Sequence, residues 1–220
     1  MTVAISAAIS AAMTAGTAAA TTAVASTMKA AILRKVHEGA EVQRAFFEQA
    51  AESIEQCVLA LAQRFRAGGK LLVMGNGGSS CDAQHLAVEF QHPIIEKRRA
   101  LPAQVLGICP ALLTAVGNDG DFSRGLVEEL ELAARADDAV VAISTSGASA
   151  NVNRALRRAR ERRLLTIGFA GRDGGAMVDS CDFAFVVPSW SIHRIQEAHT
   201  TLLHLLWDQV HVALGEDDVL

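Results

Sequence analysis

The sequence predicts an α/β fold in three layers, with a five-stranded parallel sheet flanked by helices and a long helical segment ahead of it. Two observations lead to this prediction. Five short apolar runs alternate with stretches of helical periodicity, which is typical of open parallel sheets with right-handed crossovers. Each run is also apolar at successive positions, as expected for strands that helices cover on both faces.

The segment ahead of the sheet has the pattern of an amphipathic helix. Between Met28 and Arg66, apolar residues recur at spacings of three and four. Gly68 and Gly69 follow, and glycine is common just past the end of a helix. We expect Gly39 to divide this segment into two helices.

The first 27 residues form a biased tract of alanine, threonine and serine. A secretory signal needs a basic region ahead of a strongly apolar core, whereas the first basic residue here is Lys29. We therefore expect no export signal, a disordered or loosely helical tail over residues 1–27, and a single domain over residues 28–220.

The remaining elements follow in alternation. The predicted strands are the apolar runs at 71–75, 103–108, 139–144, 164–170 and 183–188. The predicted helices lie near 80–91, 111–117, 123–136, 149–162 and 173–178, with a long final helix over 192–214. Ligands of such folds bind beyond the carboxyl ends of the strands, so we expect the functional residues directly after the strands.

Composition narrows the class of partner. The formal net charge is −4, which argues against nucleic acid and against an anionic membrane surface. The run "RRARERR" at residues 157–163 is basic. We interpret it as a solvated helix face, with a phosphate-contacting patch as the alternative. No segment is long and apolar enough for a membrane span. The scattered cysteines indicate reduced thiols in a cytoplasmic protein: Cys57, Cys81, Cys109 and Cys181.

The first candidate site is the turn "GNGGSS", which follows the first predicted strand. It lacks the lysine of a phosphate-binding P-loop, and Ser80 takes the place of the last glycine of a dinucleotide-binding motif. Its glycines and serines, placed ahead of a helix, still suit an anion. The alternative is a tight turn whose helix is capped by Ser79 or Ser80.

A second hydroxyl-rich loop, "STSGASAN", follows the third predicted strand. It could be a cluster that caps the next helix. Two such loops on one sheet instead suggest a sugar phosphate, with one loop for the phosphate and the other for the sugar hydroxyls. The hydroxyl groups belong to Ser144, Thr145, Ser146 and Ser149.

His85 and Glu89 stand four residues apart on the helix that leaves the glycine turn. Residues with this spacing share one helix face. The pair could supply two ligands to one metal, or an acid beside a base. The alternative is a surface pair without a chemical role.

The final helix offers Gln196, His199 and His204. Together with His85 and Glu89, these candidates could supply an amide, a carboxylate and two imidazoles to a mixed nitrogen and oxygen zinc site. Gln196 and His204 lie about 12 Å apart along an ideal helix axis. They can share one ion only if the helix starts irregularly at Gln196, if long side chains reach inward, or if two subunits contribute. His199 could instead be a core or interface residue.

Five segments in this order resemble the phosphoheptose isomerase branch of the sugar isomerase (SIS) domain family. The resemblance runs from about residue 30 to the C-terminus. The segments are "GNGGSSCDAQHLAVEF", "AVGNDGDFSR", "ISTSGASANV", "TIGFAGRDGGAM" and "IQEAHTTLLHLLWD".

The resemblance implies an activity and an assembly. Members isomerise sedoheptulose 7-phosphate to D-glycero-D-manno-heptose 7-phosphate through an enediol, the first step toward the nucleotide-activated heptose of lipopolysaccharide core and other glycans. They are cytoplasmic homotetramers with active sites between subunits. The resemblance also implies one zinc ion per subunit, on positions matching His85, Glu89, Gln196 and His204.

By the same resemblance, Glu89 is the catalytic base and His204 its acid/base partner. Ser144, Thr145, Ser146 and Ser149 would hold the phosphate end. The other expected substrate contacts are Asn76, Gly77, Ser79, Glu89, Asp119 and Gln196.

Some positions depart from the family pattern. Pro93 stands near the place of an arginine that holds substrate, with Lys97, Arg98 and Arg99 as candidate substitutes. Cys109 and His193 each replace an aspartate, and the segment after Asp119 is shortened. The sugar is therefore left open, and another ketose phosphate is an alternative substrate. Two alternative functions are a non-catalytic SIS protein that binds the bacterial replication initiator and a sugar-phosphate sensor domain.

Overall fold

The computed structural model describes residues 2–95 and 98–218, with side chains described from residue 27 onward. The chain forms two compact units, Met1–Glu41 and Val42–Leu220. The proposed division at residue 27 stays a prediction, because most of the proposed tail's side chains lie outside the described part.

The first helix, α1, spans Thr2–Arg66. The predicted break at Gly39 is wrong. A single glycine costs a helix only about 1 kcal/mol relative to alanine, so the good helix formers on either side continue the helix through it. None of the helices in the described residues is long and apolar enough to cross a membrane.

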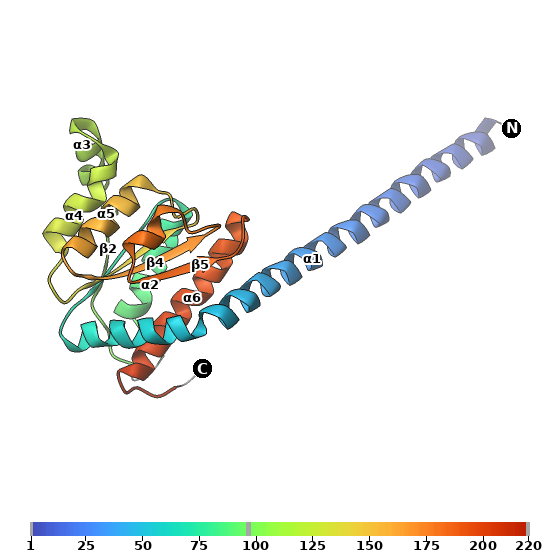
Figure 1. The fold of residues 1–220 in the computed structure, drawn as a ribbon. Helices are drawn as coiled ribbons and strands as arrows, with labels where there is room; N and C mark the ends of the chain where they lie inside the picture. The colour runs from blue at the N-terminus through green and yellow to red at the C-terminus, as the bar shows by residue number, and fades with distance from the viewer. Residues whose placement is uncertain (1, 96–97, 219–220) are drawn as a thin grey trace. The chain divides into compact units, whose positions relative to one another are not determined.

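The second unit is built on a β-sheet that helices flank (Figure 1). The sheet is parallel and has five strands, in the order β2-β1-β3-β4-β5. All four neighbouring pairs are parallel, which confirms the predicted fold class. The strands are β1 (Leu71–Gly75), β2 (Ala103–Val105), β3 (Ala139–Ser144), β4 (Leu165–Gly171) and β5 (Phe183–Val187).

Helices connect the strands, at the predicted places with small shifts. They are α2 (Gly78–Gln91), α3 (Pro110–Asp119), α4 (Gly125–Ala133), α5 (Ala150–Glu161) and α6 (Ile192–Ala213). Two further segments are 3-10 helices, η1 (Phe122–Arg124) and η2 (Gly175–Ser180). The second of these replaces the helix predicted at 173–178. It starts late because Gly174 and Gly175 both adopt positive φ angles, which an α-helix does not accommodate.

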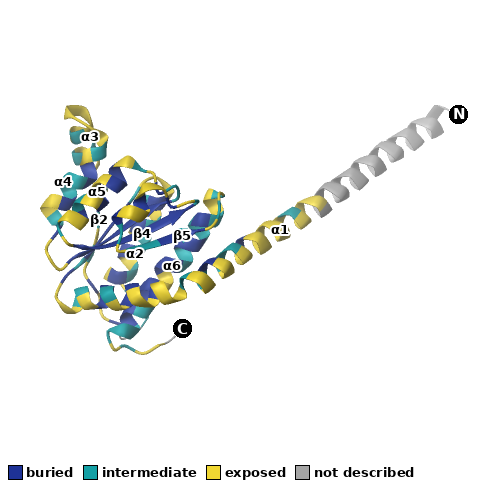
Figure 2. Cartoon of the chain, in the orientation of Figure 1, coloured by how far each residue is buried: buried dark blue, intermediate teal, exposed yellow. Residues whose placement is uncertain are grey.

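Two apolar layers sandwich the sheet. Successive strand residues point to opposite faces, so Val73 and Val141 pack with α1, α2 and α6, whereas Leu72 and Val140 pack with α4 and α5. The interior strands β3 and β4 are buried along their whole length, and the sheet lies within the buried part of this unit (Figure 2). This explains why their sequences are mostly apolar, with Ser144 and Thr166 as the polar exceptions.

The arginine-rich end of α5 carries ion pairs with nearby acids. Arg158 pairs with Glu131 and Glu161, and Arg162 also pairs with Glu131. Each of these side chains is at least one-quarter exposed. The structure therefore confirms the predicted charged and solvated helix face.

The strand order creates a switch point between β1 and β3. After β1 the chain goes to β2 on one side, and after β3 it goes to β4 on the other side. The loops after these neighbouring strands therefore diverge at the carboxyl end of the sheet, the place where open α/β folds bind ligands. The glycine turn and the hydroxyl-rich loop are these two loops.

Candidate active site

The glycine turn, residues 76–80, is a compact hydrogen-bonded turn. The backbone N–H groups of Ser79 and Ser80 donate to the carbonyls of Asn76 and Gly77, at 3.1 and 3.0 Å. Gly77 has a φ of +55° and is the N-cap of α2, and no side chain caps the helix. The alternative in which Ser79 or Ser80 caps α2 is therefore wrong.

Gly78 lets α6 approach the turn. A Cβ atom on Gly78 would stand 2.4 Å from Nε2 of Gln196. The predicted site residue Gln196 is thus placed directly against the glycine turn. Since α6 is helical from Ile192 onward, an irregular helix start at Gln196 is wrong as the explanation of the eight-residue spacing to His204. Two explanations of the spacing are left: long side chains that reach inward, or ligands contributed by two subunits.

The hydroxyl-rich loop after β3, residues 144–149, is held by its own hydroxyl groups. The Oγ atoms of Ser144 and Ser149 lie 3.0 Å apart, and Oγ of Ser146 accepts from the Ala148 N–H at 3.2 Å. Gly147 turns the loop with a φ of +61°. The loop therefore presents several hydroxyl groups at the carboxyl end of β3, in a fixed arrangement that suits a phosphate.

Three predicted ligands meet between α2 and α6. Nε2 of His85 lies 3.2 Å from Oε1 of Glu89 and 3.2 Å from Nε2 of His204. The two imidazole rings meet edge to face, with centroids 4.8 Å apart. All three ligand atoms lie within 4.8 Å of one another. We call this group the His/Glu/His cluster.

The His/Glu/His cluster fits a zinc ion. Ligand atoms about 2.0–2.1 Å from a tetrahedral zinc stand about 3.3–3.4 Å from each other. The two contacts at 3.2 Å made by His85 are close to this separation. A single proton on Nε2 of His85 cannot serve both neighbours, whereas one cation can be shared by all three atoms. Two imidazoles and one carboxylate are also a known ligand set of catalytic zinc sites.

Asp82 lies one helical turn before His85 and was not among the predicted site residues. Its Oδ2 atom is buried and has no hydrogen-bond partner among the described residues. Burial raises the pKa of this carboxyl group, and the nearby His85 opposes that rise. The spacing of three residues between Asp82 and His85 in "DAQH" was the signal in the sequence that could have placed Asp82 on the same helix face as His85.

His199 belongs to the core rather than to the His/Glu/His cluster. Its side chain is completely buried, and its Nε2–H group donates to the Ala170 carbonyl at 3.0 Å. Burial lowers its pKa to about 4. The core interpretation of this histidine is therefore the correct one.

Two other candidates lie elsewhere. Asp119 is exposed at the end of α3, where its carboxylate accepts from Nδ2 of Asn118, and its place in the site stays a prediction. Arg98 is buried in an ion pair with Asp208, at 2.6 Å. It is therefore unavailable as a substitute for the missing substrate arginine, and Lys97 lies outside the described residues.

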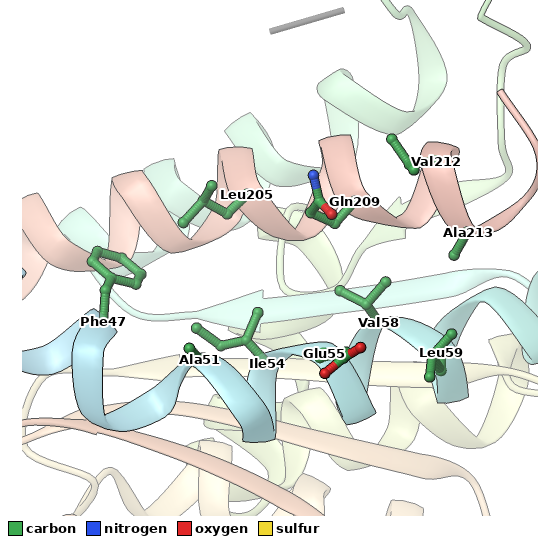
Figure 3. Close-up of a pocket in the computed structure, with 10 residues that line it drawn as sticks. All are labelled: Phe47, Ala51, Ile54, Glu55, Val58, Leu59, Leu205, Gln209, Val212 and Ala213. Atoms are coloured by element: carbon green, nitrogen blue, oxygen red, sulfur yellow. The ribbon is translucent and has the colours of Figure 1, made fainter. Parts of the chain in front are cut away.

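An apolar cavity of about 420 Å³ lies between α1 and α6 (Figure 3). Phe47, Ile54 and Val58 of α1 face Leu205 and Val212 of α6 across it. Its lining offers little for proton transfer or metal binding, so the chemistry is assigned to the His/Glu/His cluster.

Comparison with known proteins agrees with the fold. The SIS domain family profile matches residues 36–171, and the chain belongs to this family. A phosphoheptose isomerase of Pelobacter propionicus is 47% identical over 176 residues, covering 78% of this chain and 93% of that protein. A phosphoheptose isomerase of Roseiflexus sp. is 39% identical, covering 84% and 94%.

Solved structures agree as well. The phosphoheptose isomerase of Neisseria gonorrhoeae superimposes with a TM-score of 0.77 at 33% identity, covering 83% of this chain and 98% of that one. That of Francisella tularensis has a TM-score of 0.74 at 32% identity, covering 82% and 98%. Within the SIS family, the chain belongs to the phosphoheptose isomerase branch, as its motifs predicted.

Proposed function

We propose that this protein isomerises sedoheptulose 7-phosphate to D-glycero-D-manno-heptose 7-phosphate. The observation that carries the proposal is the His/Glu/His cluster, an acid/base group whose residues His85 and Glu89 lie on the helix that begins at the glycine turn. The relatives named phosphoheptose isomerase support the same substrate. The reaction would supply the first intermediate toward a nucleotide-activated heptose, in the cytoplasm.

The hydroxyl-rich loop would hold the phosphate end of the substrate through Ser144, Thr145, Ser146 and Ser149. The glycine turn would contact the sugar through Asn76, Gly77 and Ser79. Gln196 lies against this turn, so its amide would reach the same part of the substrate. Asp119 is proposed to bind sugar hydroxyls.

The chemistry is a balanced transfer of protons. Glu89 would take a proton from C1 of the ketose while His204 donates one to the carbonyl oxygen on C2, which gives the enediol. His204 would then take back the proton of the C1 hydroxyl, and Glu89 would deliver its proton to C2. The product is the aldose, both residues return to their starting state, and no oxidant or reductant is needed. A positioned base of this kind contributes on the order of 10² to 10⁴ in rate.

His85, Glu89, His204 and Gln196 would hold one zinc ion per subunit. Zinc, when bound, polarises carbonyl and hydroxyl oxygens and so makes the neighbouring C–H group more acidic. Glu89 has two carboxylate oxygens, so one can face the ion while the other acts as the base. His204 would combine ligation with proton transfer in the same way, through its two ring nitrogens.

A homotetramer with active sites between subunits is part of the proposal. The His85 side chain is 38% exposed and His204 is also exposed. The cluster is therefore open on one side, whereas isomerases that form an enediol benefit from excluding water. A neighbouring subunit would close the site.

The test is turnover by the purified protein, with metal content measured on the same sample. Wild type should convert sedoheptulose 7-phosphate and contain about one zinc per chain. Glu89→Gln should lose at least a hundredfold in kcat, while Glu52→Gln, at an exposed position of α1, should match wild type. Turnover of a shorter ketose phosphate alone would overturn the assigned substrate, and full activity of Glu89→Gln would overturn the mechanism.

A further inference from the structure

The side-chain amides of Asn76 and Asn151 face each other and exchange two hydrogen bonds. Nδ2 of Asn76 donates to Oδ1 of Asn151 at 2.8 Å, and Nδ2 of Asn151 donates to Oδ1 of Asn76 at 2.9 Å. Asn151 is only 6% exposed. Two bonds between planar groups fix orientation as well as distance, because rotating either amide breaks both. We call this contact the amide pair.

The amide pair spans the switch point of the sheet. Asn76 is the first residue after β1, and Asn151 is the second residue of α5, directly after the hydroxyl-rich loop. The ladder between β1 and β3 ends with Gly75 opposite Ile143. The amide pair therefore joins the glycine turn to the hydroxyl-rich loop just where the backbone pairing of their strands stops.

The hydroxyl-rich loop has separate anchors of its own. The Gly147 carbonyl accepts from Nδ2 of Asn153 at 2.8 Å and from the Met177 N–H at 3.1 Å. A Cβ atom on Gly147 would stand 1.9 Å from the Gly174 carbonyl oxygen, so the loop is also packed tightly against the segment before η2. Its shape does not depend on Asn151.

The pair leaves Asn76 able to bind a ligand. Each amide has two N–H donors and two acceptor lone pairs, and the pair uses one of each. Asn76 keeps one N–H group and one lone pair, in an orientation that Asn151 sets. Asn151 itself is buried and is positioned to act through its partner.

We propose that Asn151 is a positioning residue that sets the separation between the glycine turn and the hydroxyl-rich loop. This inference rests on the proposed function and deepens it. A ligand that spans both loops, such as a sugar phosphate, depends on their separation. A ligand that occupies only the hydroxyl-rich loop, such as inorganic phosphate, does not.

The test compares these two ligands in Asn151→Leu, which keeps the size of the side chain and removes both hydrogen bonds. The KM for sedoheptulose 7-phosphate should rise about tenfold, which corresponds to about 1.4 kcal/mol. The inhibition constant of inorganic phosphate should stay within about twofold of wild type. Asn151→Ser introduces a smaller polar side chain that cannot reach Asn76, and it should change the two constants in the same way. This variant replaces Asn151→Leu in the test if the leucine variant does not fold.

A control variant separates positioning from general stability. Thr166→Val removes two partly buried hydrogen bonds between the Thr166 hydroxyl and Asp182, at the amino end of β4 and away from both loops. It should lower the melting temperature and leave both constants unchanged. Equal rises in KM and in the phosphate constant for the Asn151 variants would show collapse of the loop itself and overturn the proposal. No change in either constant would overturn it too.

Failure of the positioning role can be told apart from failure of the proposed function. If wild type binds the sugar phosphate without turning it over, the proposed function fails, and calorimetric affinities for the same two ligands test the amide pair. If wild type turns over the substrate and the Asn151 variants keep its KM, the positioning role fails alone. If no sugar phosphate binds wild type, both fail.

Discussion

Replacing His199 is expected to remove a large part of the acid sensitivity of the fold. The side chain is completely buried in α6, between Gln196 and His204. Its Nε2–H group donates to the Ala170 carbonyl, and Nδ1 has no partner among the described residues. Adding a proton at Nδ1 would thus place an unpaired charge in the core, which explains why burial lowers the pKa from 6.5 to about 4.

The sign and size of the effect follow from proton linkage. Between about pH 6.5 and pH 4 the unfolded chain binds a proton at His199 and the native protein does not, so the free energy of unfolding falls as the pH falls. Each unit of pKa difference corresponds to about 1.4 kcal/mol. The difference between 6.5 and about 4 therefore amounts to about 3 kcal/mol, lost mostly by pH 4.

The assay is chemical denaturation of wild type and His199→Gln at several pH values between 7 and 4. Glutamine keeps an N–H group that can reach the Ala170 carbonyl and has no proton to bind in this range. The variant should lose about 3 kcal/mol less than wild type on acidification. Burial also lowers the pKa of His211. Because His211 is present in both proteins, its contribution cancels in the difference between the two pH curves. Parallel pH curves would refute the reasoning.

Three further outcomes are expected. Gly78→Ala puts a Cβ atom 2.4 Å from Nε2 of Gln196; since that side chain can swing away, activity should fall at least tenfold with little loss of melting temperature. Gly147→Ala combines a φ of +61° with a Cβ atom 1.9 Å from the rigid Gly174 carbonyl oxygen, so the free energy of unfolding should fall by about 2–4 kcal/mol in denaturant titrations. Dialysis against a chelator should abolish turnover, and added zinc should restore it in wild type but not in His204→Ala.

The fold was predictable because its signals are local. Each strand of a doubly covered parallel sheet is expected to be apolar at successive positions, and most residues of β3 and β4 satisfy this. The errors arose where a local signal was weak or was outweighed by its surroundings. One glycine at position 39 did not break a helix, and two glycines at 174 and 175 delayed one.

The candidate site was only partly predictable from the sequence. The helical spacing of His85 and Glu89 implied one face. The final helix offered both His199 and His204 as candidates, and the family resemblance selected His204. The amide pair was not predicted, because nothing in the local pattern of either loop shows which residue 75 positions away completes its hydrogen bonds. The ion pair of Arg98 was not predicted for the same reason, because its partner Asp208 lies far along the chain on the final helix.

The most direct test of the account is the fate of hydrogen at C2 during turnover in deuterated water. Purified wild type with sedoheptulose 7-phosphate would be followed by proton nuclear magnetic resonance. Glu89 is proposed to carry the proton between C1 and C2 through an enediol, and a proton on its carboxyl group can exchange with the solvent while the enediol exists. Part of the product should therefore contain deuterium at C2, and Glu89→Gln should form neither product nor exchanged substrate. Product that Glu89→Gln forms at the wild-type rate, with the C1 hydrogen kept quantitatively at C2, would contradict the account, since that result indicates a hydride shift that needs no base.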